Sequence, residues 1–178
     1  MEYVVIGKNR ITGQQKWILE HCRFRESPKR RQESLCKKAF ENGINYFDTA
    51  RAYSDSEEKM GAALADVRDQ VIISTKTAAQ DAKEFWKDLE ESLTKLQTDY
   101  IDLYQFHNPA FCPKPGDGTG LYEAALEAKE QGKIRHIGIT NHRIAVAKEA
   151  VLSGLYETLQ FPFSYLASEE EKELVKPL

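Results

Sequence analysis

Cysteine is scarce in this sequence, and its three residues, Cys22, Cys36 and Cys112, lie far apart. They offer no disulfide framework, no CxxC pair and no spacing typical of a metal site, so we expect no bound metal. Long apolar runs are absent as well. The first apolar run, Tyr3 to Ile6, is far too short for a signal peptide or a membrane span. Together these absences predict a protein of the reducing cytoplasm.

An excess of either charge is also missing. The net charge is −3, with 25 basic and 28 acidic residues, so the overall charge favours neither nucleic acid nor a membrane surface as a partner. Apolar residues make up 41% of the chain and charged residues 30%, a balance typical of a globular protein. A chain of 178 residues can bury a core and usually forms one domain.

From Phe40 onward, short apolar segments alternate with segments of helical periodicity. Strands are predicted over Tyr46–Thr49, Val71–Thr75, Tyr100–His107, Ile134–Thr140 and Thr158–Phe161. Helices are expected from a capping box at Ser54–Glu57, around Phe85–Leu96, over Leu121–Glu130 and Ala145–Leu152, and from Ser168 to Val175. Such alternation predicts βαβ units around a parallel sheet, an α/β fold.

Polar side chains that can take part in catalysis lie at the ends of three of these strands. Asp48 ends the first strand, and Tyr53 comes five residues later in a loop. Lys76 and His107 close the next two strands. Taken singly, each has a commoner explanation: a helix cap, a packed ring, a solvated charge and a satisfied polar group. Together, at the ends of successive strands, they favour a shared site, because parallel strands bring their carboxyl ends to one edge.

These four residues resemble the catalytic tetrad of the aldo-keto reductases. The resemblance covers roughly Phe40 to Val175 and implies a (β/α)8 barrel, of which this chain would hold strands two to six. Strands seven and eight would be missing and strand one disrupted. The group within the family that looks most similar carries a cysteine-rich, ferredoxin-like extension after the barrel. We expect no such extension here, and therefore no iron–sulfur role.

The resemblance also implies a reaction, the NAD(P)H-dependent reduction of an aldehyde or ketone to an alcohol, or its reverse. Tyr53 would be the general acid, although an unperturbed phenol has a pKa of about 10. The ammonium of Lys76 would lower that pKa by favouring the phenolate, and Asp48 would hold the lysine by ion pairing. His107 would orient and polarise the carbonyl oxygen. The substrate's identity, the choice between NADH and NADPH, and the oligomeric state stay open.

Cofactor contacts follow from the same resemblance. Thr140 and Asn141, within Gly138-Ile139-Thr140-Asn141, would hold the nicotinamide carboxamide together with Gln160. An ordinary polar strand residue is the alternative for Gln160. The loop from Asn108 to Gly118 is a substrate-loop candidate by its position, and Tyr165 could contact the cofactor or merely pack.

The first 39 residues do not fit the family pattern. No helical stripe emerges before Cys36, Pro28 interrupts the segment, and the family's glycine-rich first strand is absent. Codons can be chosen for this segment whose shifted frame translates to family-like strings such as D-F-G-A-L-P-I-Q-R-V-S-K-E-E. We therefore divide the chain into an aberrant, possibly frame-shifted segment (1–39) and a barrel portion (40–178), and expect an impaired fragment.

Two other functions compete with this interpretation. One is a non-catalytic, nucleotide-sensing or partner-binding protein on the same fold, which the complete tetrad argues against. The other is a nucleic-acid module built on the basic segment Arg23–Lys38, in which no aromatic residues interleave with the charges as base stacking would require.

Overall fold

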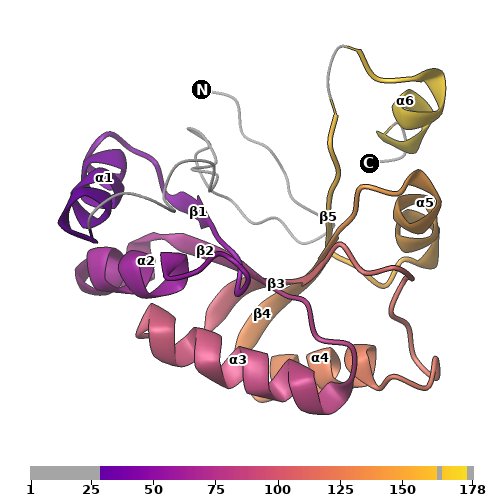
Figure 1. The fold of residues 1–178 in the computed structure, drawn as a ribbon, viewed down its shortest axis with the longest axis horizontal. Helices are drawn as coiled ribbons and strands as arrows, with labels where there is room; N and C mark the ends of the chain where they lie inside the picture. The colour runs from indigo at the N-terminus through magenta and orange to yellow at the C-terminus, as the bar shows by residue number, and fades with distance from the viewer. Residues whose placement is uncertain (1–28, 164–165, 176–178) are drawn as a thin grey trace.

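The computed structural model describes residues 29–163 and 166–175, which form a curled, half-barrel sheet with helices against it (Figure 1). Five parallel strands pair in the order β1-β2-β3-β4-β5. They are β1 (Tyr46–Asp48), β2 (Ile72–Thr77), β3 (Ile101–His107), β4 (Ile134–Thr140) and β5 (Thr158–Gln160). The predicted α/β fold class, a partial (β/α)8 barrel, is confirmed.

A helix follows each strand, as right-handed βαβ connections require. The helices are α2 (Ser56–Leu64), α3 (Ala82–Leu96), α4 (Leu121–Glu130), α5 (Ile144–Ser153) and α6 (Glu169–Val175). Figure 1 shows α2, α3 and α4 along one face of the sheet. A 3₁₀ segment, η1 (Ala65–Gln70), which the sequence did not predict, leads from α2 into β2.

Two local predictions are wrong. A helix, α1 (Lys29–Glu41), occupies the end of the segment in which no helical stripe was expected. Its Cys36 and Ala39 are buried in the core, although Lys37 and Lys38 separate them in the sequence. The described residues leave out most of the predicted 1–39 unit, including the expected strand one and Cys22, so the two-part division stays a prediction. Tyr165 also lies outside the described residues.

The capping box at Ser54 is the second wrong prediction. Helix α2 begins at Ser56, its N-cap is Asp55, and no side chain caps it. Ser54 has a left-handed φ of 51°, which an N-cap residue does not adopt. The carboxylate of Glu57, which should have closed the box, accepts a hydrogen bond from the Thr75 hydroxyl of β2 instead.

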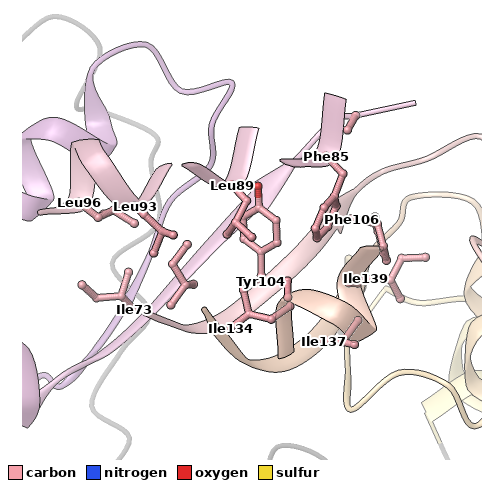
Figure 2. Close-up of a cluster of buried hydrophobic side chains, with 14 of the residues drawn as sticks. Ile73, Phe85, Leu89, Leu93, Leu96, Tyr104, Phe106, Ile134, Ile137 and Ile139 are labelled. Carbon is pink, nitrogen blue, oxygen red and sulfur yellow. The ribbon is translucent and has the colours of Figure 1, made fainter. Parts of the chain in front are cut away.

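The core lies between α3 and the sheet (Figure 2). Helix α3 begins where the Asp81 carboxylate accepts a hydrogen bond from the Glu84 N–H. One apolar face of α3 is buried against Ile73, Tyr104 and Phe106; its residues are Phe85, Leu89, Leu93 and Leu96. The Phe85 ring meets the Tyr104 ring edge to face, with centroids 5.4 Å apart. This packing anchors the central strands and thereby the residues at their ends.

The amino end of the sheet is held by a charged cluster around Asp102. Its buried carboxylate accepts hydrogen bonds from Arg68, Arg135 and the backbone N–H of Ile73. Both guanidinium groups lie over the Tyr100 ring, 4.0 Å and 3.8 Å from its centroid. These contacts stabilise the end opposite to the candidate site. None of the helices in the described ranges is long and apolar enough to cross a bilayer.

Candidate active site

The carboxyl ends of the strands bring the predicted residues to one edge of the sheet. Asp48, His107, Thr140 and Gln160 are each the last residue of their strand, and Lys76 is the last but one of β2. Strand register places His107 opposite Thr140, and Thr140 opposite Gln160. Residues opposite one another on paired strands share a face, so these side chains form one row.

The side of the sheet on which this row lies follows from the neighbours of Lys76. Thr75 and Thr77 flank it, and their hydroxyls bond Glu57 of α2 and Asp88 of α3. Successive side chains of a strand point to opposite faces. Lys76 therefore points away from the helices, into the concave side of the sheet.

An ion pair between Asp48 and Lys76 forms the floor of the site. The Lys76 ammonium donates one hydrogen bond to the Asp48 carboxylate and another, of 2.8 Å, to the carbonyl oxygen of Thr49. Both charged side chains are 2% exposed. A buried charge without a partner is costly, and Asp48 supplies the opposite charge at this point.

Tyr53 and His107 lie above this pair. Their rings meet edge to face, with centroids 5.6 Å apart, and the Lys76 ammonium lies 5.5 Å from the centroid of the Tyr53 ring. Both rings are half-buried. The structure thus brings the four predicted residues together, with two buried charges below and two partly accessible rings above.

A second tyrosine near the site, Tyr46, is chemically different from Tyr53. Burial raises the pKa of Tyr46 well above its usual range, and the negative charge of Asp48 raises it further, while a hydrogen bond with Ser74 lowers it only in part. Tyr46 therefore keeps its proton at neutral pH.

The predicted cofactor residues are partly engaged within the protein. The Thr140 hydroxyl accepts a 3.1 Å hydrogen bond from the Asn108 N–H. The Asn141 side chain is buried, where it donates to the Pro109 carbonyl and accepts from the Arg143 N–H. The backbone carbonyl of Gln160 accepts a hydrogen bond from the backbone N–H of Asn141. Thr140 and Asn141 thus also brace the loop that follows β3.

A polar layer beneath the row was not predicted. The Gln105 amide donates a 3.0 Å hydrogen bond to the Ser74 hydroxyl, and Gln105 lies in register with Lys76 and Gly138. A Cβ at Gly138 would lie 2.2 Å from the Thr158 hydroxyl oxygen, so glycine permits the close approach of β4 and β5. The strand alternation that places Gln105 two residues before His107, on the same face, could have revealed this layer.

Known proteins resemble the whole described chain. The sequence model of the Aldo/keto reductase family matches residues 4–177. The aldo-keto reductase YhdN of Bacillus subtilis is 32% identical over 193 residues, covering 98% of this chain and 57% of that protein. The methylglyoxal reductase DkgA of Yersinia pestis is 41% identical over 115 residues, covering 63% of this chain and 40% of that protein.

A solved structure agrees with these matches. An aldo-keto reductase from Bacillus halodurans, in its holo form, superposes with a TM-score of 0.81 at 26% identity, covering 97% of this chain and 61% of that one. The chain spans about half the length of the curated relatives it matches.

Proposed function

The chain belongs to the aldo-keto reductase family, and from this premise we propose that it reduces the carbonyl group of a small aldehyde or ketone with NADPH or NADH. The observation that carries the proposal is the buried Asp48–Lys76 pair directly beneath the half-buried rings of Tyr53 and His107. Carbonyl reduction needs a proton donor and a stabiliser of the developing negative oxygen at the same point, and this group of residues contains both.

Each of the four residues has a role in this proposal. A bound nicotinamide supplies the hydride to the carbonyl carbon. Tyr53 holds the proton at its phenol oxygen and donates it to the carbonyl oxygen. The positive charge of Lys76 stabilises the phenolate that remains, Asp48 keeps Lys76 charged, and His107 orients the carbonyl oxygen by a hydrogen bond.

The end of β4 and β5 fits the cofactor's amide. Thr140, Asn141 and Gln160 present a hydroxyl and two amide groups, whose donors and acceptors match those of a carboxamide. The register of Thr140 with both His107 and Gln160 supports the proposal for Thr140 and Gln160. We propose that they hold the nicotinamide beside Tyr53.

The name of a relative suggests a substrate class. The Yersinia pestis protein is named a methylglyoxal reductase, and we propose that a small dicarbonyl of this kind is a substrate here. Such a molecule has no large group that would need an extended binding surface.

The test is turnover of methylglyoxal by the 178-residue chain, followed as the loss of NADPH absorbance. We expect Tyr53→Phe to lower kcat by about 100-fold or more, because general acid catalysis contributes on that order. The matched control is Tyr46→Phe, which removes the neighbouring hydroxyl and should retain activity. The impaired activity expected of this chain stays a prediction, which the wild-type rate tests.

Two results would contradict the proposal. Equal rates for wild type and Tyr53→Phe would overturn the role of Tyr53. Binding of NADPH without turnover of any carbonyl by the wild-type chain would contradict the reductase proposal and favour the nucleotide-sensing alternative.

A further inference from the structure

We propose that Arg51 is a positioning residue that fixes the Tyr53 loop, residues 49–55, to the helical layer and so sets the place of the Tyr53 ring. This inference rests on the proposed function for its effect on turnover, but its geometric part is independent of it. Arg51 lies two residues before Tyr53 in the same loop, so it would act through the backbone of that loop.

The backbone of the loop is tied to β2 on both sides of the Asp48–Lys76 pair. The Thr49 N–H donates to the Ser74 carbonyl at 2.8 Å, and the Arg51 N–H donates to the Lys76 carbonyl at 2.9 Å. Beyond Arg51 the loop turns back, with the Tyr53 N–H bonded to the Ala50 carbonyl. Arg51 is therefore the last residue that β2 holds before the turn that presents Tyr53.

The side chain of Arg51 extends from the loop to two helices, α2 and α3. One terminal nitrogen pairs with the Glu91 carboxylate of α3, and the other lies 3.8 Å from the Glu57 carboxylate of α2. A planar guanidinium can meet two carboxylates at once, whereas an ammonium acts as a single point charge. Arg51 thus connects β2, α2 and α3 to the loop.

Both carboxylates are held in place by other groups. Glu57 is almost completely buried and accepts a 2.7 Å hydrogen bond from the Thr75 hydroxyl. Glu91 also pairs with the Lys95 ammonium at 3.0 Å. Hydrogen bonds from Arg51 and Lys95 lower the pKa of Glu91 to about 2, so it stays charged at neutral pH. Arg51 therefore pairs with a charged Glu91 and lies beside a Glu57 that is bonded to β2.

The kinetic test compares Arg51→Gln with Arg51→Lys and with Lys95→Gln in the full chain. Lys95→Gln is the matched control, because it removes the other cation bound to Glu91 without touching the loop. We expect Arg51→Gln to lower kcat by about 10- to 100-fold, since small misplacements of a reacting group have such effects. The KM for methylglyoxal should change less than threefold. Arg51→Lys should recover only part of the rate, and Lys95→Gln should match wild type.

A second readout does not depend on turnover. The edge-to-face contact places His107 in the ring current of Tyr53, so the carbon-bound protons of the His107 imidazole report the position of the Tyr53 ring. Their NMR signals, assigned among the 4 histidines with His107→Asn, should move in Arg51→Gln toward their position in Tyr53→Leu. They should not move in Lys95→Gln.

The outcomes separate the two proposals. A shifted His107 signal with a lowered kcat supports the positioning role. A shifted signal in a chain without any turnover supports the positioning role and contradicts the proposed function. An unshifted His107 signal in a folded Arg51→Gln variant overturns the inference, whatever the rate, and so does equal loss of kcat in Arg51→Gln and Lys95→Gln.

Discussion

The Tyr53 and His107 rings stand nearly perpendicular to each other, with an interplanar angle of 85° and centroids 5.6 Å apart. Tyr53 comes from the loop between β1 and α2, whereas His107 ends β3, so only the folded sheet brings them together. The Lys76 ammonium lies 5.5 Å from the centroid of the Tyr53 ring, so the ring pair and the buried ion pair form one group.

Asp48→Ala should strongly destabilise the fold. It leaves the Lys76 ammonium buried without its carboxylate, and loss of one partner of a buried pair costs about 3–5 kcal/mol in the free energy of unfolding. Urea unfolding at neutral pH measures this. Lys148→Gln is the control, because its pair with Glu170 is exposed on both sides and should contribute no more than about 1 kcal/mol. Equal effects of the two variants would contradict the structural role of the buried pair.

Gly138→Ala should destabilise the chain through crowding. The new Cβ would lie 2.2 Å from the Thr158 hydroxyl oxygen and 3.0 Å from Cγ of Gln105. Overpacking of this kind costs about 1–3 kcal/mol. The double variant with Thr158→Ala, which removes the nearest atom, should recover part of the loss. A cycle of these variants in thermal unfolding tests the contact, and additive effects would show that Thr158 does not cause the strain.

Glu57→Gln should change the dependence of stability on pH. Burial raises the pKa of Glu57, and the hydrogen bond from Thr75 and the charge of Arg51 offset this only in part. The folded chain therefore binds this proton more tightly than the unfolded chain. Stability from Glu57 is greatest below its unfolded pKa of about 4.3 and falls as pH rises through the raised folded value.

The glutamine variant lacks this titration. Its free energy of unfolding, measured relative to wild type, should increase as pH rises between about 4 and 8. Urea unfolding of both proteins across this range is the measurement. Parallel curves would mean that Glu57 titrates alike in the folded and unfolded chain.

Phe85→Ala should cost about 3–5 kcal/mol, because it opens a cavity between α3 and the central strands. The ring is 1% exposed and contacts Tyr104 and Phe106. Leu152→Ala is the control, since Leu152 is 85% exposed and its truncation should stay within about 0.5 kcal/mol. Urea midpoints give both values, and a cost below about 1 kcal/mol for Phe85→Ala would show that this core relaxes around the loss.

The regular part of the fold could be predicted because its signals are local. Each predicted strand lies within two residues of an observed one, since short apolar runs bounded by helical stripes leave few alternatives. Helix α1 was missed because its buried Cys36 and Ala39 are small and Lys37 and Lys38 lie between them. The apolar stripe is therefore weak, and α1 forms by packing against α2 rather than by its own pattern.

Local rules failed at Ser54 for a related reason. The spacing of Ser54 and Glu57 satisfied a capping box, but Glu57 accepts a buried hydrogen bond from Thr75 on β2 instead. A local spacing rule does not reveal a partner that lies 18 positions away along the chain. The Gln105–Ser74 hydrogen bond and the contact of Gly138 with Thr158 are likewise produced by strand register.

By itself, the sequence determined the βαβ alternation, the polar residues that end the strands, and the family to which the chain belongs. These depend on the period of apolar residues and on residue types at short spacings, which are written along the chain. Only the tertiary structure decided that Lys76 is buried against Asp48, that the ring of Tyr53 stands against that of His107, and that Arg51 joins the loop to two helices. Those contacts depend on register and on the packing of helices against the sheet, which arise only when the whole sheet forms.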